Sequence, residues 1–230
     1  MRGPPGEAFL VERTAAQASA GCMRIGLTGG RGILGRIAIK QLLSRGHEVN
    51  SFSGDVCDLS ALQAWAVEAQ AEAVLHFAAV VPTQTVQADP ARAFRVNVGG
   101  TANLVSALAD SERKPWLFYA SSSHVYRPQP EPLREDAPVS PINPYGLSKR
   151  MGEQVVETSA GPAGLPWCVG RIFSFYHPTA KVWRAAENGF LKYDLVMISY
   201  GDNIGDPTNR LVAFLEDVNI YPIGQEETWT

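Results

Sequence analysis

The chain has 230 residues, of which 45% are hydrophobic and 19% are charged, and its 20 basic and 23 acidic side chains leave a formal net charge of -3. This length suits one domain, or one domain with a small additional portion, because domains commonly hold ~100–200 residues. The balance of charge argues against a nucleic-acid partner, since binding to a phosphate backbone requires a cationic field.

The cysteines and the apolar runs exclude several further classes of protein. Cys22, Cys57 and Cys168 lie far apart without CxxC spacing, which argues against a disulfide scaffold or a zinc ribbon and favours a reducing compartment. We therefore expect a cytoplasmic protein without a metal site. The longest apolar run, residues 73–81, is less than half of the ~20 residues that a membrane-spanning helix needs, so we expect no membrane partner. Residues 1–22 hold too short an apolar core for a signal peptide and are expected to form a disordered extension.

Strand and helix patterns alternate along the chain from residue 23 onward. Such alternation predicts an α/β fold, in which a doubly wound parallel sheet carries helices on both faces. Beyond residue 178 the patterns are weaker, with a helix expected at 182–191, a strand at 195–200 and a helix at 211–218. The earlier elements are strands at 24–28, 48–52, 73–79, 116–120 and 167–173, and helices at 34–44, 59–71, 90–110 and 144–158.

A glycine-rich segment, TGGRGILG at residues 28–35, follows the first predicted strand and opens the first predicted helix. Gly30, Gly32 and Gly35 satisfy the G-x-G-x-x-G pattern, and starting from Gly29 gives the wider G-x-x-G-x-x-G spacing. Glycine permits a tight turn and lets the backbone approach a pyrophosphate, which amides at a helix N-terminus then bind. The segment therefore predicts a site for a dinucleotide cofactor, the alternative being a glycine turn without a ligand.

The end of the second predicted strand bears on the choice between NAD and NADP. A dinucleotide site expects an acidic residue ~20 positions after the glycines to bind the adenosine ribose. Here that position is Ser53, and the nearest acid is displaced to Asp55. A 2'-phosphate would meet less repulsion there and would find a cation in Arg31, which favours NADP, unless Arg31 is simply a solvated loop arginine.

Two further patterns indicate proton-transfer chemistry. Tyr145 and Lys149 lie one turn apart on one face of a predicted helix. A tyrosine, with an ordinary pKa of ~10, acts as a base near neutral pH only where positive charge stabilises its phenolate, and Lys149 would supply that charge. Residues 121–123 are serines that follow the fourth predicted strand, at the edge of the sheet where open α/β folds bind ligands.

Taken together and in this order, these motifs resemble the extended short-chain dehydrogenases/reductases of the NAD-dependent epimerase/dehydratase type, the group that includes UDP-galactose 4-epimerases and dTDP-sugar reductases. The resemblance covers about residues 23–180 and implies a Rossmann-type sheet. The matching segments are TGGRGILG at 28–35, GDV at 54–56, HFAA at 76–79, NVGGT at 97–101, SSSHVY at 121–126, PYGLSK at 144–149 and RIF at 171–173.

The resemblance also implies roles for individual residues. It makes Tyr145 the catalytic acid/base, Lys149 its partner on the nicotinamide ribose, and Ser122 the family's catalytic serine, because Ser122 lies four residues before Tyr126. Hydride would pass between a sugar carbon and the nicotinamide while Tyr145 transfers the hydroxyl proton. The implied cofactor-binding residues are Gly29, Arg31, Gly32, Ile33, Leu34, Gly35, Asp55, Val56, Ala78, Ala79, Asn97, Tyr145 and Lys149.

Three residues differ from those that the family usually carries, and these differences restrict the reactions that we expect. Dehydratases carry an acidic pair after the catalytic serine or threonine, whereas this chain has Ser123 and His124, which disfavours dehydration. Ser174 replaces an asparagine that helps to bind the nucleotide diphosphate in the family. We expect Ser123, His124 and Ser174 to lie at the substrate, a nucleotide-activated sugar that the enzyme reduces or epimerises with NAD or NADP.

The resemblance divides the chain into an NAD(P)-binding domain at residues 23–178 and a short or incomplete substrate-binding portion at 179–230. A shortened lobe removes substrate positioning, so the alternative is a dinucleotide-binding protein without turnover, acting as a sensor or a partner subunit. The family also implies a homodimer through two helices of each subunit, for which residues 90–110 and 144–158 are the candidates.

Overall fold

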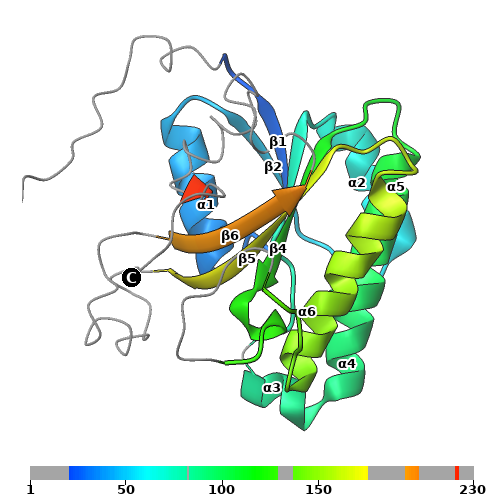
Figure 1. The fold of residues 1–230 in the computed structure, drawn as a ribbon. Coiled ribbons are helices and arrows are strands. Elements are labelled where there is room, and N and C mark those ends of the chain that lie inside the picture. Colours follow the sequence, from blue (N-terminus) through cyan, green and yellow to red (C-terminus); the bar gives the residue numbers. More distant parts are fainter. Residues whose placement is uncertain (1–20, 82, 129–136, 176–194, 202–220, 223–230) are drawn as a thin grey trace, which may run out of the picture.

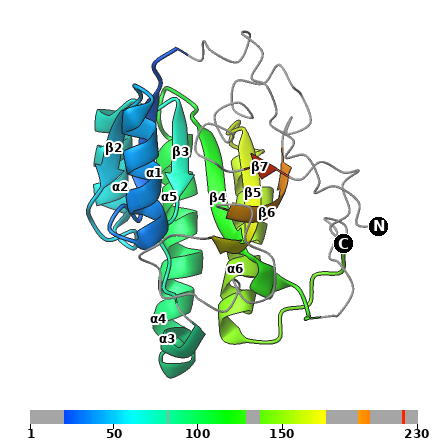
Figure 2. The same cartoon turned by 90° about the vertical axis from the view of Figure 1, so that its left-hand side faces the viewer.

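The computed structural model describes residues 21–81, 83–128, 137–175, 195–201 and 221–222. Its core is a sheet in the order β2-β1-β3-β4-β5-β6-β7, in which the first five strands are parallel, β6 runs antiparallel to β5, and β7 is parallel to β6. Figure 2 shows β2 near one edge and β6 and β7 at the other. The strands are β1 (Arg24–Thr28), β2 (Glu48–Phe52), β3 (Ala73–His76), β4 (Trp116–Ser122), β5 (Trp167–Phe175), β6 (Leu195–Gly201) and β7 (Tyr221–Pro222).

Helices cover both faces of this sheet (Figure 1). One face carries α1 (Ile33–Ser44), and the other carries α2 (Leu59–Ala69), α5 (Gly100–Ala109) and α6 (Pro144–Val155). Two short helices, α3 (Thr83–Ala88) and α4 (Pro90–Phe94), precede α5. The predicted doubly wound α/β fold is therefore confirmed.

The central strands are apolar on both faces because both faces are covered. In β4, Leu117 and Tyr119 pack into the core under α2 and α5, whereas Trp116 and Phe118 pack into the core under α1. This alternation follows from the two-residue period of a strand. The continuous apolar run that the sequence shows at 116–120 is thus the pattern of a buried parallel strand.

Several element boundaries differ from the sequence-based prediction. β3 ends at His76, three residues early. The Phe77 N–H still donates to Thr28 O, but the next amide, that of Ala78, donates to the Thr28 side chain instead of to a neighbouring strand. β4 extends through Ser121 and Ser122, which pair with Arg171 and Ile172 of β5, so these two serines end a strand rather than follow it. The strand predicted at 195–200 is confirmed as β6. Residues 1–20 of the extension expected at 1–22, and the helices expected at 182–191 and 211–218, lie outside the described residues.

The helix predicted over residues 90–110 is present but is not a regular α-helix. A π-helical turn, η2 (Arg95–Gly99), separates α4 from α5. Two successive glycines at the junction lower the helix propensity there, and such turns occur often at functional positions. A second π-turn, η4 (Val156–Ala160), continues α6.

Among the residues that the structure describes, no helix combines the length and the apolar character that a membrane crossing requires.

Candidate functional site

The glycine-rich loop forms a tight turn between β1 and α1. Gly29 has a φ of +77°, and a Cβ added to it would lie 2.6 Å from Ala78 N and from Phe77 C. The Gly32 N–H donates to Gly29 O at 3.0 Å and closes the turn. Gly29 therefore needs to be glycine for two reasons, its left-handed backbone conformation and the close approach of the chain after β3.

The N-terminus of α1 is suited to an anion. Its N-cap residue is Gly32, which makes no side-chain capping bond, and the first turn contains no acidic residue. By contrast, Asp58 caps α2 and Asn143 caps α6 through side-chain oxygens. The first amides of α1 thus have no side chain to bind, and together with the helix dipole they fit a pyrophosphate. Of the expected cofactor residues, Gly29, Arg31, Gly32, Ile33, Leu34 and Gly35 all lie in this turn or in the first turn of α1.

The end of β2 lies beside this loop, as the sequence analysis requires for an adenosine site. Arg31 Nη2 donates to Ser53 O at 3.3 Å. The Asp55 carboxylate accepts a hydrogen bond from the Cys57 N–H at 2.9 Å, and this bond holds the pKa of Asp55 below its ordinary value. Val56 is buried and packs close to Gly100.

A buried chain of hydrogen bonds shapes the turn that follows β3. The Ala78 N–H donates to Thr28 Oγ1, which lies 2.6 Å from His76 Nδ1, while His76 Nε2 lies 3.0 Å from Thr101 Oγ1. Because the Thr101 hydroxyl donates to Asn97 O, it accepts from His76, so the proton of the neutral imidazole is on Nε2. Burial, followed by the charge of Lys149, lowers the pKa of His76 to about 3, which keeps the ring neutral. Ala78 and Ala79 are thereby held opposite the glycine loop.

Asn97 is buried in the π-turn, and its side chain is occupied within the protein. Its Oδ1 accepts from the Val80 N–H at 2.7 Å, and its Nδ2 donates to Ser148 Oγ at 3.0 Å and to Val80 O. Asn97 therefore joins the loop after β3 to α6. This placement sets the walls of the expected cofactor site.

The three expected catalytic residues come together at the end of β4 and the start of α6. Ser122 is the last residue of β4, and its hydroxyl accepts from the His124 N–H at 3.2 Å. Burial raises the pKa of Tyr145, while the nearby Ser122 hydroxyl acts in the opposite direction. Lys149 is only 4% exposed, and its Nζ lies 4.7 Å from the centre of the Tyr119 ring.

Burial also changes the pKa of Lys149. Burial lowers the pKa of its ammonium to about 8, and the negative charge of Glu153 opposes this effect. The sequence analysis found Tyr145 and Lys149 from their spacing but not Glu153. The signal was present, because Glu153 follows Lys149 by the same four residues and so lies on the same face of α6.

The three residues expected at the substrate do not all lie beside Tyr145. Ser123 and His124 form a single 3-10 turn after β4, and the His124 ring packs edge-on against the Tyr145 ring with centroids 5.4 Å apart. Ser174 lies further along the sheet, in β5, where its backbone pairs with Val196. Within the described part of the chain, no cluster of three or more His, Cys, Asp or Glu residues is arranged to bind a metal ion.

Comparison with known proteins identifies the family to which this fold belongs. A sequence model of the NAD dependent epimerase/dehydratase family matches residues 25–203, more than half of the chain. The chain belongs to this family. The resemblance inferred from the motifs is therefore confirmed.

Several relatives are similar over the same part of the chain. UDP-glucose 4-epimerase from Lactobacillus helveticus is 26% identical over 170 residues, which cover 66% of this chain and 52% of that protein. The crystal structure of UDP-glucose 4-epimerase from Thermus thermophilus in complex with NAD has a TM-score of 0.59 and 28% identity, covering 63% of this chain and 53% of that one. The structure of dTDP-4-dehydrorhamnose reductase from Bacillus anthracis in complex with NADP has a TM-score of 0.56 and 27% identity, covering 61% and 51%. The chain thus spans about half the length of these relatives.

Proposed function

We propose that this protein is an NAD(P)-dependent enzyme that reduces or epimerises a nucleotide-activated sugar. The observation that carries the proposal is the meeting of Ser122, Tyr145 and Lys149 at the edge of the sheet that also holds the uncapped N-terminus of α1. Its relatives include epimerases of UDP-glucose and reductases of dTDP-sugars, one of each with a bound dinucleotide.

Tyr145, Ser122 and Lys149 each have a different role in the proposed proton transfer. Because burial raises its pKa, Tyr145 rests as a neutral phenol that can donate a proton to a developing sugar alkoxide. In the oxidative direction the phenolate accepts the hydroxyl proton of the sugar and returns to the phenol, while Ser122 holds the sugar oxygen and Tyr145 in line by hydrogen bonding. The ammonium of Lys149 stabilises the phenolate. A bound nicotinamide supplies or accepts the hydride.

We propose NADP rather than NAD as the preferred cofactor. Arg31 reaches the end of β2, where Ser53 stands at the position that an acidic residue would occupy in an NAD site. A guanidinium binds a phosphate strongly through paired N–H donors. The adenosine 2'-phosphate would therefore find a cation and no opposing carboxylate at Ser53.

We also propose that the protein forms a homodimer and that it works in a reducing compartment. The surface of α6 supports the dimer, and the cysteines support the compartment. Leu147 and Met151, which are 44% and 37% exposed, stand one turn apart on α6 and give that helix an apolar outer stripe. A second copy of the chain packed along α5 and α6 would cover this stripe. The free thiols of Cys22, Cys57 and Cys168 support the cytoplasm as the location.

The first experiment is a fluorescence titration of the protein with NADPH and with NADH. We expect NADPH to bind more tightly. Nucleotide-linked 4-keto sugars are then screened by the loss of reduced-cofactor absorbance, and UDP-sugars by epimer analysis. Absence of binding by either cofactor would overturn the proposal, and binding without turnover across the screen would favour the non-catalytic alternative.

Tyr145→Phe tests the assignment of the acid/base. This variant removes the exchangeable proton but keeps the ring, so the rate should fall by about 10²–10⁴-fold. The thermal unfolding midpoint measured on the same sample serves as the control for folding and should remain close to that of the wild type. A variant with full turnover would show that another group transfers the proton.

A further inference from the structure

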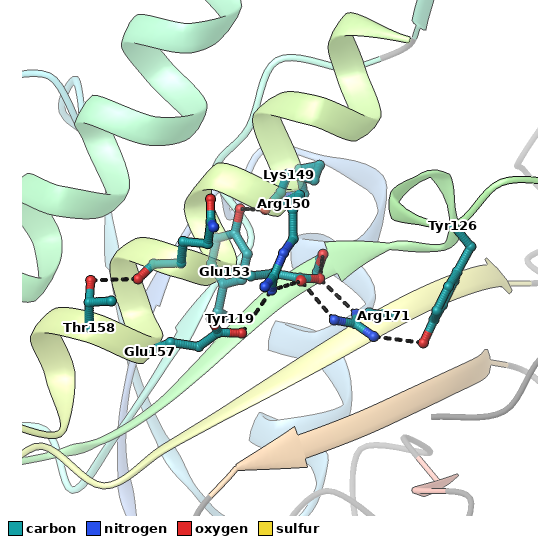
Figure 3. Close-up of polar contacts among 10 residues, drawn as sticks. Tyr119, Tyr126, Lys149, Arg150, Glu153, Glu157, Thr158 and Arg171 are labelled. Carbon is teal, nitrogen blue, oxygen red and sulfur yellow. Dashed lines mark hydrogen bonds and ion pairs between the residues drawn. The ribbon is translucent and has the colours of Figure 1, made fainter. Parts of the chain in front are cut away.

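Glu153 lies in the interior, one turn after Lys149 on α6, with a side chain that is 0% exposed. Arg171 of β5 donates to both of its carboxylate oxygens, from Nε and Nη2, each at 2.9 Å. The hydroxyl of Ser121 donates to Oε1, and Arg150 Nη1 donates to Oε2 at 2.9 Å. Figure 3 shows Arg171 between Glu153 and Tyr126, whose hydroxyl accepts a third bond from the guanidinium at 2.7 Å.

These contacts join three elements of the site at one point. Ser121 and Arg171 are paired residues of β4 and β5, and both donate to the same carboxylate. Ser121 is followed directly by Ser122, whose hydroxyl acts on the pKa of the Tyr145 phenol. The Glu153 carboxylate thus ties the second turn of α6 after Tyr145 to the two strands beneath it.

Glu153 is also the acidic group that acts on Lys149. The other titratable groups around Lys149 are Tyr119 on β4, whose hydroxyl donates to Lys149 O, His76 on β3, and Tyr145 on α6 itself. His76 is neutral, and burial raises the pKa of Tyr119 far above its ordinary value, so neither offsets the ammonium charge.

We propose that Glu153 is a positioning residue of the reaction, an inference that rests on the proposed function. Through Ser121 and Arg171 its carboxylate fixes α6 at the register in which Tyr145 meets Ser122, and it is the counter-charge that keeps Lys149 an ammonium in a buried site.

The electrostatics agree with this role. Burial acts to raise the pKa of Glu153, but the hydrogen bonds and charge of Arg171, together with the hydrogen bonds from Ser121 and Arg150, outweigh it and leave the pKa below its ordinary value. The carboxylate is therefore ionised wherever Lys149 titrates. Its loss would leave burial as the influence that acts on the pKa of Lys149, and would remove the two bonds that Arg171 donates to this carboxylate.

The test measures the charge of Lys149 directly, without a substrate. The chain has five lysines, so ¹³C-labelled lysine gives few NMR signals, and the signal that disappears in Lys149→Met is assigned to Lys149. In Glu153→Gln the midpoint of this signal should fall by about one pH unit, the size expected when an opposite charge close to a buried ammonium is lost. Glu153→Asp, which keeps the charge, should restore most of the shift.

Glu157→Gln is the matched control. Glu157 follows Glu153 by one turn and shares its partner Arg150, but its side chain is 27% exposed. This variant should leave the Lys149 midpoint unchanged. Should Glu153→Gln fail to fold, the double variant Glu153→Met/Arg171→Met removes both members of the buried pair. It should also lower the midpoint, because Glu153 acts on the pKa of Lys149 and Arg171 does not.

An unchanged Lys149 midpoint in either folded variant would overturn the inference. The alkaline limit of turnover should move by the same amount as the midpoint, which a merely structural role would not produce. A shifted midpoint in a protein that binds neither NADPH nor NADH would leave the coupling intact and would count against the proposed function instead.

Discussion

Burial acts in opposite directions on the two side chains that would share the reacting proton. It raises the pKa of the Tyr145 phenol and lowers the pKa of the Lys149 ammonium to about 8, because in each case the charged form loses hydration. Tyr145 therefore rests uncharged, while Lys149 remains mostly charged at neutral pH and loses that charge at mildly alkaline pH. A nearby charge shifts the pKa of such buried groups, and for Lys149 that charge is the carboxylate of Glu153.

His76 should make folding stability depend on pH. Its imidazole takes up a proton in the unfolded chain below an ordinary pKa of ~6.5, but in the folded protein only near pH 3. The stabilisation is complete above the unfolded pKa and is lost as the pH falls through this window, at up to ~1.4 kcal/mol per pH unit. Urea unfolding of the wild type and of His76→Gln should show the steeper acid loss only in the wild type.

His124→Gln is the control for this measurement, because His124 is exposed and lies outside the Thr28–Thr101 hydrogen-bond chain. It should keep the wild-type slope. Equal slopes for the wild type and for His76→Gln would show that the proton released on folding belongs to another group.

Arg31 should set the cofactor preference. Arg31→Ala removes the cation beside the end of β2, and the Kd for NADPH should rise about tenfold, the equivalent of one charge-assisted hydrogen bond. The Kd for NADH, which lacks the 2'-phosphate, should not change. Arg36→Ala, an exposed arginine on α1, is the control. An equal effect on both cofactors would place Arg31 on the pyrophosphate instead.

At the scale of elements, the turn from β1 into α1 depends on how closely the chain after β3 approaches it. Gly29 and Gly46 both have positive φ values, +77° and +83°, but a Cβ at Gly46 would meet nothing within 4 Å. Gly46→Ala should therefore cost about 1 kcal/mol through backbone strain alone. Gly29→Ala must also displace the backbone at Phe77 and Ala78, and should cost about 3 kcal/mol.

The two glycine variants differ in function as well as in stability. Gly29→Ala should weaken dinucleotide binding because the shifted loop no longer presents the amides of α1, whereas Gly46→Ala should bind as the wild type does. Thermal unfolding and the NADPH titration measure both effects. Equal losses for the two variants would mean that the contact with Ala78 is not what constrains the loop.

At the start of α6, local sequence signals fix the position of Tyr145, the proposed acid/base. Asn143 caps the helix through the Gly146 N–H at 2.8 Å, and Pro144 occupies the first turn, where its missing N–H is harmless. Tyr145 therefore stands in the first turn and Lys149 one turn later. The capping residue Asn143 and the proline that follows it are both visible in the sequence. The predicted start of this helix is confirmed.

At the scale of the whole molecule, the exposed stripe on α6 should mediate self-association. Leu147→Glu/Met151→Glu places two charges on it and should convert a dimer into a monomer in sedimentation velocity. Val67→Glu, on α2 and 65% exposed, is the control and should leave the dimer intact. A wild-type protein that sediments as a monomer would rule out the proposed dimer.

The fold brings the site together because parallel strands end at the same edge. Thr28, His76 and Ser122 end β1, β3 and β4, neighbours in the sheet that lie far apart in the chain. The sequence analysis predicted this convergence from the alternation of elements and from the motifs at their ends. It could not give the end of β4, because Ser121 and Ser122 are polar and only their pairing with β5 keeps them in the strand.

The sequence by itself determined the strand and helix order, the family, and the candidates Ser122, Tyr145 and Lys149, since these depend on short-range spacing and on glycine, proline and capping chemistry. Only the tertiary structure decided that Asn97 braces the loop after β3, that His76 is a neutral link between strands, and that Glu153 faces Lys149, Ser121 and Arg171. These roles depend on burial and on contacts between residues distant in the chain. Both arise from packing, which local sequence patterns do not encode.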